Sequence, residues 1–150
     1  MTLRAIILAA GVTLAPFAAS AADLAVTHVP ASPLPDGSPA PYSAAVKAGE
    51  TLYVAGVTDR GGATPTESAR RVMDNFKRMV EAGGLTMDEL VSVQVFSSNL
   101  ADYDAFNAVY RTYFKGPMPA RAYLGVDHLL GGSRFEVMGI AVRKAKSQGG

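Results

Sequence analysis

The sequence contains no cysteine and only two histidines, His28 and His128. The absence of cysteine excludes a disulfide framework, a thiol nucleophile and a thiolate zinc site. Neither histidine has a second candidate ligand nearby at a spacing that is typical of metal sites. We therefore predict that the protein holds no metal.

The sequence also lacks an excess of charge of either sign. It has 14 Lys and Arg residues against 13 Asp and Glu residues, and Arg4 is the only charged residue before Asp23. A neutral domain with scattered charges lacks the basic surface of a nucleic-acid-binding protein, and it does not resemble a membrane-surface protein. We expect neither nucleic acid nor a membrane as a partner of the mature chain.

The first residues have the pattern of a secretory signal peptide. Arg4 gives a short basic head, an apolar run follows from Ala5 to Ala19, and the small residues Ala19-Ser20-Ala21 form a cleavage site. The apolar run is shorter than the roughly 20 residues of a membrane span, and Pro16 interrupts it. An uncleaved anchor or a buried N-terminal helix is the alternative. We expect a signal peptide over residues 1–21 and export to the periplasm, where a chain without disulfides depends on core packing or assembly.

The remaining length fits one domain. We expect this domain over residues 22–143 and a flexible polar tail over residues 144–150. A first short strand is expected over residues 24–29. Five prolines between Pro30 and Pro41 then predict a loop or an extended arm, because proline removes hydrogen-bond donors and fixes φ.

A β-hairpin is expected after the proline-rich segment. Two strand-like runs, Ser43 to Lys47 and Thr51 to Val57, flank a tight Gly49-Glu50 turn. Gly56 interrupts the second run. A glycine inside a strand often marks a bulge, or the close approach of a ligand or another backbone.

An amphipathic helix is expected next. Apolar residues recur at helical spacing from Ala69 to Val80, with Thr66 as the expected N-cap and Gly83-Gly84 at the end. The pattern of residues 86–89 predicts a single helical turn. The β-branched and apolar run over residues 91–96 predicts a strand.

A second helix is expected to begin at Asn99 or Asp102 and to end near Phe114. Its apolar stripe consists of aromatic residues: Tyr103, Phe106, Tyr110, Tyr113 and Phe114. Asn107 falls on the same stripe, and a polar amide on a buried face must find partners. It is either a core asparagine with satisfied hydrogen bonds or a residue that faces a ligand.

Two further strands, Ala120 to Asp127 and Arg134 to Arg143, flank a turn at Gly131-Gly132. Both helices connect strands, which predicts an α+β fold with a mixed sheet and two helices packed on one face. No helix remains to cover the other face, on which the last strands place apolar residues: Leu124, Val126, Met138 and Ile140. A sheet with one uncovered apolar face is usually buried in an oligomer.

Arg121 is the first candidate functional residue. It opens a strand just after the rigid turn Pro117-Met118-Pro119, which fixes its backbone position. Its planar guanidinium can hold a carboxylate with two parallel hydrogen bonds. Alternatively, Arg121 pairs with a structural acid or lies in solvent, as many surface arginines do.

Segments spread over nearly the whole mature chain together resemble the RidA family, also called YjgF. The resemblance lies in the order and spacing of several pieces, of which no single one is decisive: Pro41-Tyr42-Ser43, Leu52 to Gly56, Val80 to Thr86, Val93 to Phe96, Phe106 to Tyr110, Pro119-Ala120-Arg121 and Glu136 to Val142. The resemblance implies a chorismate-mutase-like (RidA-like) fold and a homotrimer with three ligand sites in clefts between subunits. It also implies hydrolysis of 2-enamino and 2-imino acids to 2-keto acids and ammonia, without a cofactor.

The resemblance also implies roles for individual residues. Arg121 matches the family arginine that holds the substrate carboxylate, and Tyr42 matches the tyrosine that lines the cleft. Asn107 matches the asparagine near the site. Gly56 matches the glycine whose backbone approaches the ligand.

Three positions depart from the family pattern. Ala55 stands where active members have a serine, and Met138 stands where they have a glutamate that is implicated in orienting the attacking water. Loss of such a group typically costs about 10²–10⁴-fold in rate. Tyr123 replaces a frequent cysteine and should reshape the cleft. Glu136 shares a strand face with Met138 but lies about 6.7 Å further along the strand, so it cannot simply replace the missing carboxylate.

These residues leave two main hypotheses. The first is an exported imine or enamine deaminase with a weakened site, in which Arg121 anchors the carboxylate of a small imino, keto or amino acid. The second is a non-catalytic, exported binding protein of the same fold. A role in protein interaction through the apolar surface is the third.

Overall fold

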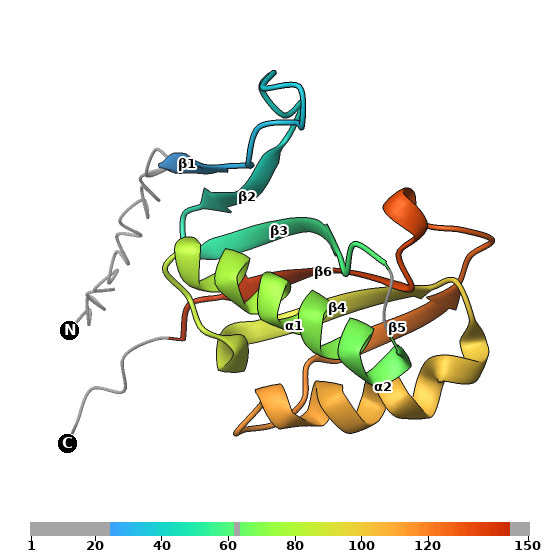
Figure 1. Ribbon diagram of the computed structural model, residues 1–150. Coiled ribbons are helices and arrows are strands. Elements are labelled where there is room, and N and C mark those ends of the chain that lie inside the picture. Colours follow the sequence, from blue (N-terminus) through green and yellow to red (C-terminus); the bar gives the residue numbers. More distant parts are fainter. Residues whose placement is uncertain (1–24, 62–63, 145–150) are drawn as a thin grey trace, which may run out of the picture.

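The computed structural model describes residues 25–61 and 64–144 of the 150-residue chain (Figure 1). These residues form one mixed sheet of six strands with two α-helices. The predicted signal peptide lies outside the described residues, and of the predicted tail only Lys144 is described.

The strands follow the order β1-β2-β3-β6-β4-β5 across the sheet. Neighbouring strands are antiparallel except for β4 and β5, which are parallel and joined by a helical crossover. The strands are β1 (Val26–Pro30), β2 (Ser43–Ala48), β3 (Thr51–Thr58), β4 (Leu90–Ser97), β5 (Ala120–Gly125) and β6 (Phe135–Val142).

The predicted hairpin and the predicted loop are both confirmed. Strands β2 and β3 pair so that Ala48 lies opposite Thr51, and a two-residue turn joins them. Gly49 in this turn has a φ of 57°, a positive value that glycine adopts readily. The segment over residues 31–42 contains no helix or strand. Gly56 does mark an irregularity, because the register of β3 against β6 shifts between Val54 and Val57.

Helix α1 (Pro65–Ala82) begins with a different N-cap from the one expected. Thr64 takes this position instead of Thr66, because its hydroxyl oxygen accepts a hydrogen bond from the backbone N–H of Glu67. The carboxylate of Glu67 accepts a hydrogen bond from the backbone N–H of Thr64 at 3.0 Å. This capping box, followed by Pro65 at the first helical position, starts the helix earlier than Thr66 would allow.

Helix α2 (Tyr103–Tyr110) is shorter than the predicted helix. A 3₁₀ turn, Leu100–Asp102, precedes it, and the Asn99 side chain caps this turn by accepting a hydrogen bond from the Ala101 N–H at 3.1 Å. A second 3₁₀ turn, Arg111–Tyr113, follows α2. There the hydroxyl of Thr112 donates to the carbonyl of Val109 at 2.7 Å, and this local bond competes with continuation of the helix.

One boundary near the C-terminus also differs from the prediction. Strand β5 ends at Gly125 and not at Asp127, because its sheet neighbour, β4, ends opposite Gly125 at Ser97. The predicted turn at Gly131-Gly132 is confirmed, as part of a 3₁₀ turn, Leu130–Gly132.

Both α-helices cover the same face of the sheet, and the hydrophobic core lies between the helices and this face (Figure 1). The opposite face, which we call the open face, carries exposed apolar and aromatic side chains: Tyr53, Leu124 and Met138. Val126 and Ile140 are half-buried. The prediction of a sheet with helices on one face only is therefore confirmed, and the open face provides apolar surface for an oligomeric contact.

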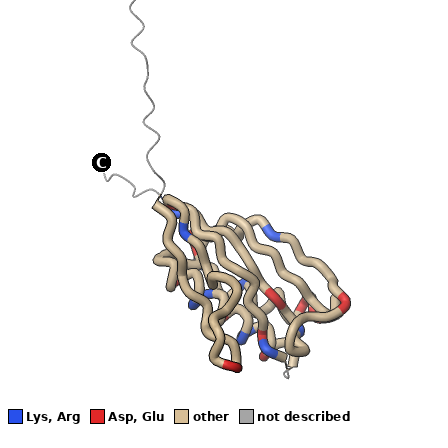
Figure 2. The backbone as a smooth tube through the Cα atoms, turned by 90° about the horizontal axis from the view of Figure 1, so that it is seen from above, with Lys and Arg blue, Asp and Glu red and all other residues tan. Residues whose placement is uncertain are grey.

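The charged residues are distributed over the molecule. Lys and Arg positions lie interspersed with Asp and Glu positions along the described chain (Figure 2). No described helix is both long and apolar enough to cross a membrane.

Candidate functional site

Arg121 lies on β5 at one edge of the sheet, opposite Val93 of β4. Side chains alternate along β5, so Arg121 and Tyr123 face the helix-covered side, where both are half-buried. The guanidinium carbon of Arg121 lies 4.7 Å from the ring centroid of Tyr110, 5.7 Å from that of Tyr123 and 5.8 Å from that of Tyr103. These distances are within the range of cation–π attraction. We call the three rings the tyrosine cage.

The cage rings belong to a larger aromatic cluster on α2, β5 and β6. Tyr103 and Tyr123 meet edge to face, with centroids 4.9 Å apart, and Tyr110 stacks on Phe106 at 5.7 Å. Burial raises the pKa of Tyr110 to about 12, and burial also raises the pKa of Tyr123. Both phenols are therefore neutral at neutral pH.

Asn107 lies on the stripe of α2 that carries the cage. It follows Tyr103 by four residues and precedes Tyr110 by three, which places the three side chains on one face of the helix. Asn107 is 7% exposed. Its side chain makes no hydrogen bond within residues 25–61 and 64–144. The choice between the two alternatives from the sequence stays a prediction.

A second group of predicted site residues lies on β3 and β6. Met138 and Glu136 point to the open face, and Ala55 and Gly56 lie on β3 beside the register shift. The carboxylate of Glu136 occupies the space where a side chain at position 56 would stand. The group that approaches Gly56 is therefore the Glu136 side chain, and the approach of a ligand to Gly56 stays a prediction.

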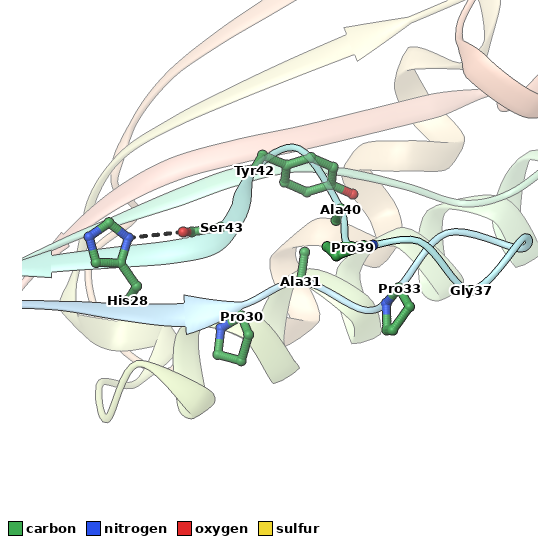
Figure 3. A pocket seen from close by; sticks show the side chains of 9 residues that line it. All are labelled: His28, Pro30, Ala31, Pro33, Gly37, Pro39, Ala40, Tyr42 and Ser43. Carbon is green, nitrogen blue, oxygen red and sulfur yellow. Dashed lines mark hydrogen bonds between the residues drawn. The ribbon is translucent and has the colours of Figure 1, made fainter.

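Tyr42 lies just before β2 and is 58% exposed. It lines an open depression of about 550 Å³ beneath the proline-rich segment (Figure 3). In the same depression Nδ1 of His28 lies 2.9 Å from the hydroxyl oxygen of Ser43. The remaining lining is mostly proline, alanine and glycine: Pro30, Ala31, Pro33, Gly37, Pro39 and Ala40.

One chain does not bring all of these residues together. Tyr42 precedes β2, whereas Arg121 lies on β5, and three strands separate β2 from β5 in the sheet. At a strand spacing of about 4.8 Å, β2 and β5 are therefore roughly 19 Å apart across the sheet. Arg121 and Met138 also face opposite sides of the sheet. A ligand that touches Arg121, Tyr42 and Met138 at once would need more than one copy of the chain.

The sequence comparison identifies the family. Residues 35–143 match the sequence model of the family described as endoribonuclease L-PSP. The chain belongs to this family, which is also called RidA or YjgF. It is 34% identical over 124 residues to a protein of Dermatophagoides farinae named 2-iminobutanoate/2-iminopropanoate deaminase, and the match covers 78% of this chain and 94% of that protein.

Solved structures confirm the predicted RidA fold. The YjgF gene product of E. coli has a TM-score of 0.66 and 31% identity, and the match covers 69% of this chain and 89% of that one. E. coli TdcF with bound serine has a TM-score of 0.70 and 25% identity, with 79% and 100% of the chains covered. The mixed sheet with two helices on one face is the chorismate-mutase-like arrangement expected for a RidA protein.

The RidA roles expected for Arg121, Tyr42, Asn107 and Gly56 stay predictions, as do the effects of Ala55, Met138 and Tyr123. In the part of the chain that the structure describes, no group of three or more His, Asp or Glu residues could hold a metal ion.

Sequence reasoning missed the partners of Arg121. It placed Tyr103 and Tyr110 on the apolar stripe of a helix and interpreted that stripe as a buried face. The available signal was their separation of seven residues, which is two helical turns and puts both rings on one face. Gly56 signalled the register shift in the sequence, but no signal showed that the Glu136 side chain would fill the space beside it.

Proposed function

We propose that this protein is an exported RidA-type protein that binds small carboxylates at Arg121 and hydrolyses 2-imino or 2-enamino acids to 2-keto acids and ammonia. One observation carries the proposal. Arg121 is a half-buried cation that lies against the three rings of the tyrosine cage, and within residues 25–61 and 64–144 no acidic side chain pairs with it. A half-buried guanidinium that has no anionic partner in its own chain favours the binding of an anionic ligand.

The comparisons support this substrate class. The relative from Dermatophagoides farinae is named for deamination of 2-iminobutanoate and 2-iminopropanoate, which are small 2-imino acids. TdcF was solved with bound serine, which also carries a carboxylate. A carboxylate ligand at Arg121 agrees with both names.

The proposed reaction needs no cofactor. Water adds to carbon 2 of the protonated imine, and one proton of the added water then moves to the nitrogen. The carbon–nitrogen bond breaks as the remaining hydroxyl proton leaves for the departing nitrogen or for water. The products are the keto acid and ammonium, which is ammonia plus the proton that the imine carried. Imines hydrolyse in water without help, so a site that mainly binds and orients the substrate can still accelerate the reaction.

The proposed site is shared between subunits of a homotrimer. Subunits that bury their open faces against one another would cover the exposed Tyr53, Leu124 and Met138, and each cleft would receive Tyr42 from one subunit and Arg121 from the next. We further propose that residues 1–21 are removed and that the mature chain works in the periplasm. Sedimentation of the mature protein at three times the mass of one chain would support the trimer.

The alternative is a non-catalytic binding protein of the same fold. Ala55 and Met138 favour it, because neither residue can orient a water molecule or transfer a proton. Such a protein would bind 2-keto or amino acids through Arg121 and leave the rate of imine hydrolysis unchanged.

The deciding experiment measures ammonia release from 2-imino acids that an amino acid oxidase generates in the cuvette. Wild type from Ala22 onward is compared with Arg121→Ala and with Arg111→Ala, which removes an exposed arginine near the end of α2. We expect acceleration by wild type and by Arg111→Ala, and little or none by Arg121→Ala. No acceleration by wild type, together with calorimetric binding of 2-oxobutanoate, would establish the binding protein instead.

A further inference from the structure

Arg121 is held differently from the other arginines whose contacts are known. Arg134 pairs with Asp102 at 2.7 Å, and Arg143 pairs with Glu50 at 3.3 Å. Arg71 donates to backbone carbonyls. Among the described residues, the guanidinium of Arg121 has neither an ion pair nor a hydrogen bond, and its close neighbours are the three rings of the tyrosine cage.

Packing within the chain sets the positions of the cage rings. Tyr110 is 4% exposed and is packed between the rings of Phe106 and Phe114, at 5.7 Å and 4.8 Å. The rings of Tyr103 and Tyr123 pack edge to face, at an interplanar angle of 87°. Two rings come from α2 and one from β5, so the packing of the helix on the sheet sets the shape of the cage.

A cage of this kind orients a guanidinium and leaves its hydrogen-bond donors free. Cation–π attraction uses the faces of the rings, whereas the five N–H donors of arginine lie in the guanidinium plane. Tyr110 and Tyr123 stay neutral at neutral pH, so they do not cancel the charge of Arg121. Their hydroxyl oxygens are buried and have no hydrogen-bond partner within residues 25–61 and 64–144. The rings therefore matter more than the hydroxyls.

We propose that Tyr103, Tyr110 and Tyr123 are positioning residues, which fix the Arg121 guanidinium so that it binds a ligand carboxylate through two parallel hydrogen bonds. The inference rests on the proposed function, because it concerns the same carboxylate site. It assigns the geometry of that site to three rings of this chain. Removal of a ring lets the guanidinium turn, which weakens carboxylate binding without a matching loss of stability.

The test compares ring-removing with ring-conserving variants at the two less buried positions. Tyr103→Leu and Tyr123→Leu remove a ring, whereas Tyr103→Phe and Tyr123→Phe remove only a hydroxyl. Calorimetry with 2-oxobutanoate measures carboxylate binding, and its methyl ester serves as the ligand without the anion. We expect each Leu variant to bind 2-oxobutanoate roughly 3- to 30-fold more weakly than wild type, and each Phe variant to bind within about twofold of it.

Two further measurements separate a positioning role from a structural one. The side-chain N–H resonance of Arg121, assigned by its loss in Arg121→Ala, should be displaced by ring currents in wild type and in the Phe variants, and should move back in the Leu variants. Melting temperatures report stability. A positioning role changes binding and the resonance together, whereas a structural role lowers the melting temperature and leaves the affinity of the folded protein unchanged.

The outcomes distinguish this inference from the proposed function. If Arg121→Ala binds 2-oxobutanoate and accelerates imine hydrolysis as wild type does, the proposed function is wrong. If Arg121→Ala loses binding while both Leu variants bind like wild type, only the inference about the cage is wrong. Absence of 2-oxobutanoate binding by wild type at millimolar concentration, with the displaced Arg121 resonance intact, would also overturn the inference.

Discussion

The carboxylate of Glu136 lies against the backbone of Gly56, in the space that a side chain at position 56 would need. The register shift between β3 and β6 makes this approach possible. The distance along β6 between Glu136 and Met138 argued that Glu136 could not simply replace the missing family glutamate. The side chain of Glu136, however, extends toward the glycine that is predicted to approach the ligand. A carboxylate is therefore present near the predicted site, although it comes from a different position.

Gly56→Ala should turn the Glu136 carboxylate away from position 56 at little cost in stability, because the atom that would meet the new Cβ is the end of a flexible side chain. Urea unfolding should place its free energy of unfolding within about 1 kcal/mol of that of Gly116→Ala, the matched control, whose new Cβ lies 4.0 Å from the nearest atom, an oxygen of Asp88. A loss of about 1–3 kcal/mol in Gly56→Ala that the double variant Gly56→Ala/Glu136→Ala regains would show instead that Glu136 is held in place.

Met138→Glu should raise the rate of imine hydrolysis. Met138 is 37% exposed on the open face, so a glutamate there can be accommodated, and it restores the carboxylate that active relatives are expected to use. Since a positioned acid–base group contributes about 10²–10⁴-fold, we expect at least a tenfold gain in kcat/KM. Met138→Gln has a similar size without the charge and should give no gain. Equal rates for the two variants would mean that the missing glutamate does not limit the reaction.

The elements of the fold could be predicted from the sequence because each has a local cause. The spacing of apolar residues from Ala69 to Val80 gave α1, and the turn at Gly49-Glu50 gave the hairpin. The error at the N-cap also has a local cause, because Thr64 and Thr66 flank Pro65 and both have the hydroxyl of a cap. Only the reciprocal bonds with Glu67 decide between them, and these need three-dimensional geometry.

The site could be predicted only in part. The turn before Arg121 indicated a fixed arginine, but its ring partners Tyr103 and Tyr110 are far from it in sequence and meet it through the packing of α2 on the sheet. Aromatic residues on a helix stripe indicate core equally well. Gly56 indicated an irregularity in β3, but the contact of the Glu136 side chain with it depends on the pairing of β3 with β6, which brings together residues far apart in the sequence.

Asp59→Ala should be strongly destabilising. Asp59 is completely buried after β3, and its Oδ1 accepts hydrogen bonds from the backbone N–H groups of Arg134 at 2.8 Å and Phe135 at 3.3 Å. Alanine would leave both donors buried and unpaired, at a cost of about 2–4 kcal/mol. Asp59→Asn keeps an acceptor oxygen and should cost less. If the urea unfolding curves of Asp59→Ala and Asp59→Asn coincide, the hydrogen bonds from Arg134 and Phe135 to Asp59 do not contribute to the free energy of unfolding.

Tyr110→Phe should make the protein less sensitive to alkaline pH. Burial raises the pKa of Tyr110 from 10.0 to about 12 in the folded state. Between these values the unfolded chain has lost the phenolic proton and the folded chain still holds it, so the free energy of unfolding falls as the pH rises. The contribution is complete below about pH 10 and lost by about pH 12, and its size is on the order of 1–3 kcal/mol.

The measurement is urea unfolding of wild type and Tyr110→Phe at several pH values from neutral to about pH 12. The two should be nearly equally stable at neutral pH, because the Tyr110 hydroxyl has no hydrogen-bond partner among the described residues. Above about pH 10 the stability of wild type should fall more steeply than that of the variant. Tyr42→Phe, which changes a tyrosine that is 58% exposed, should follow wild type. Parallel pH profiles for wild type and Tyr110→Phe would contradict the raised pKa, and with it the neutrality of the most buried ring beside Arg121.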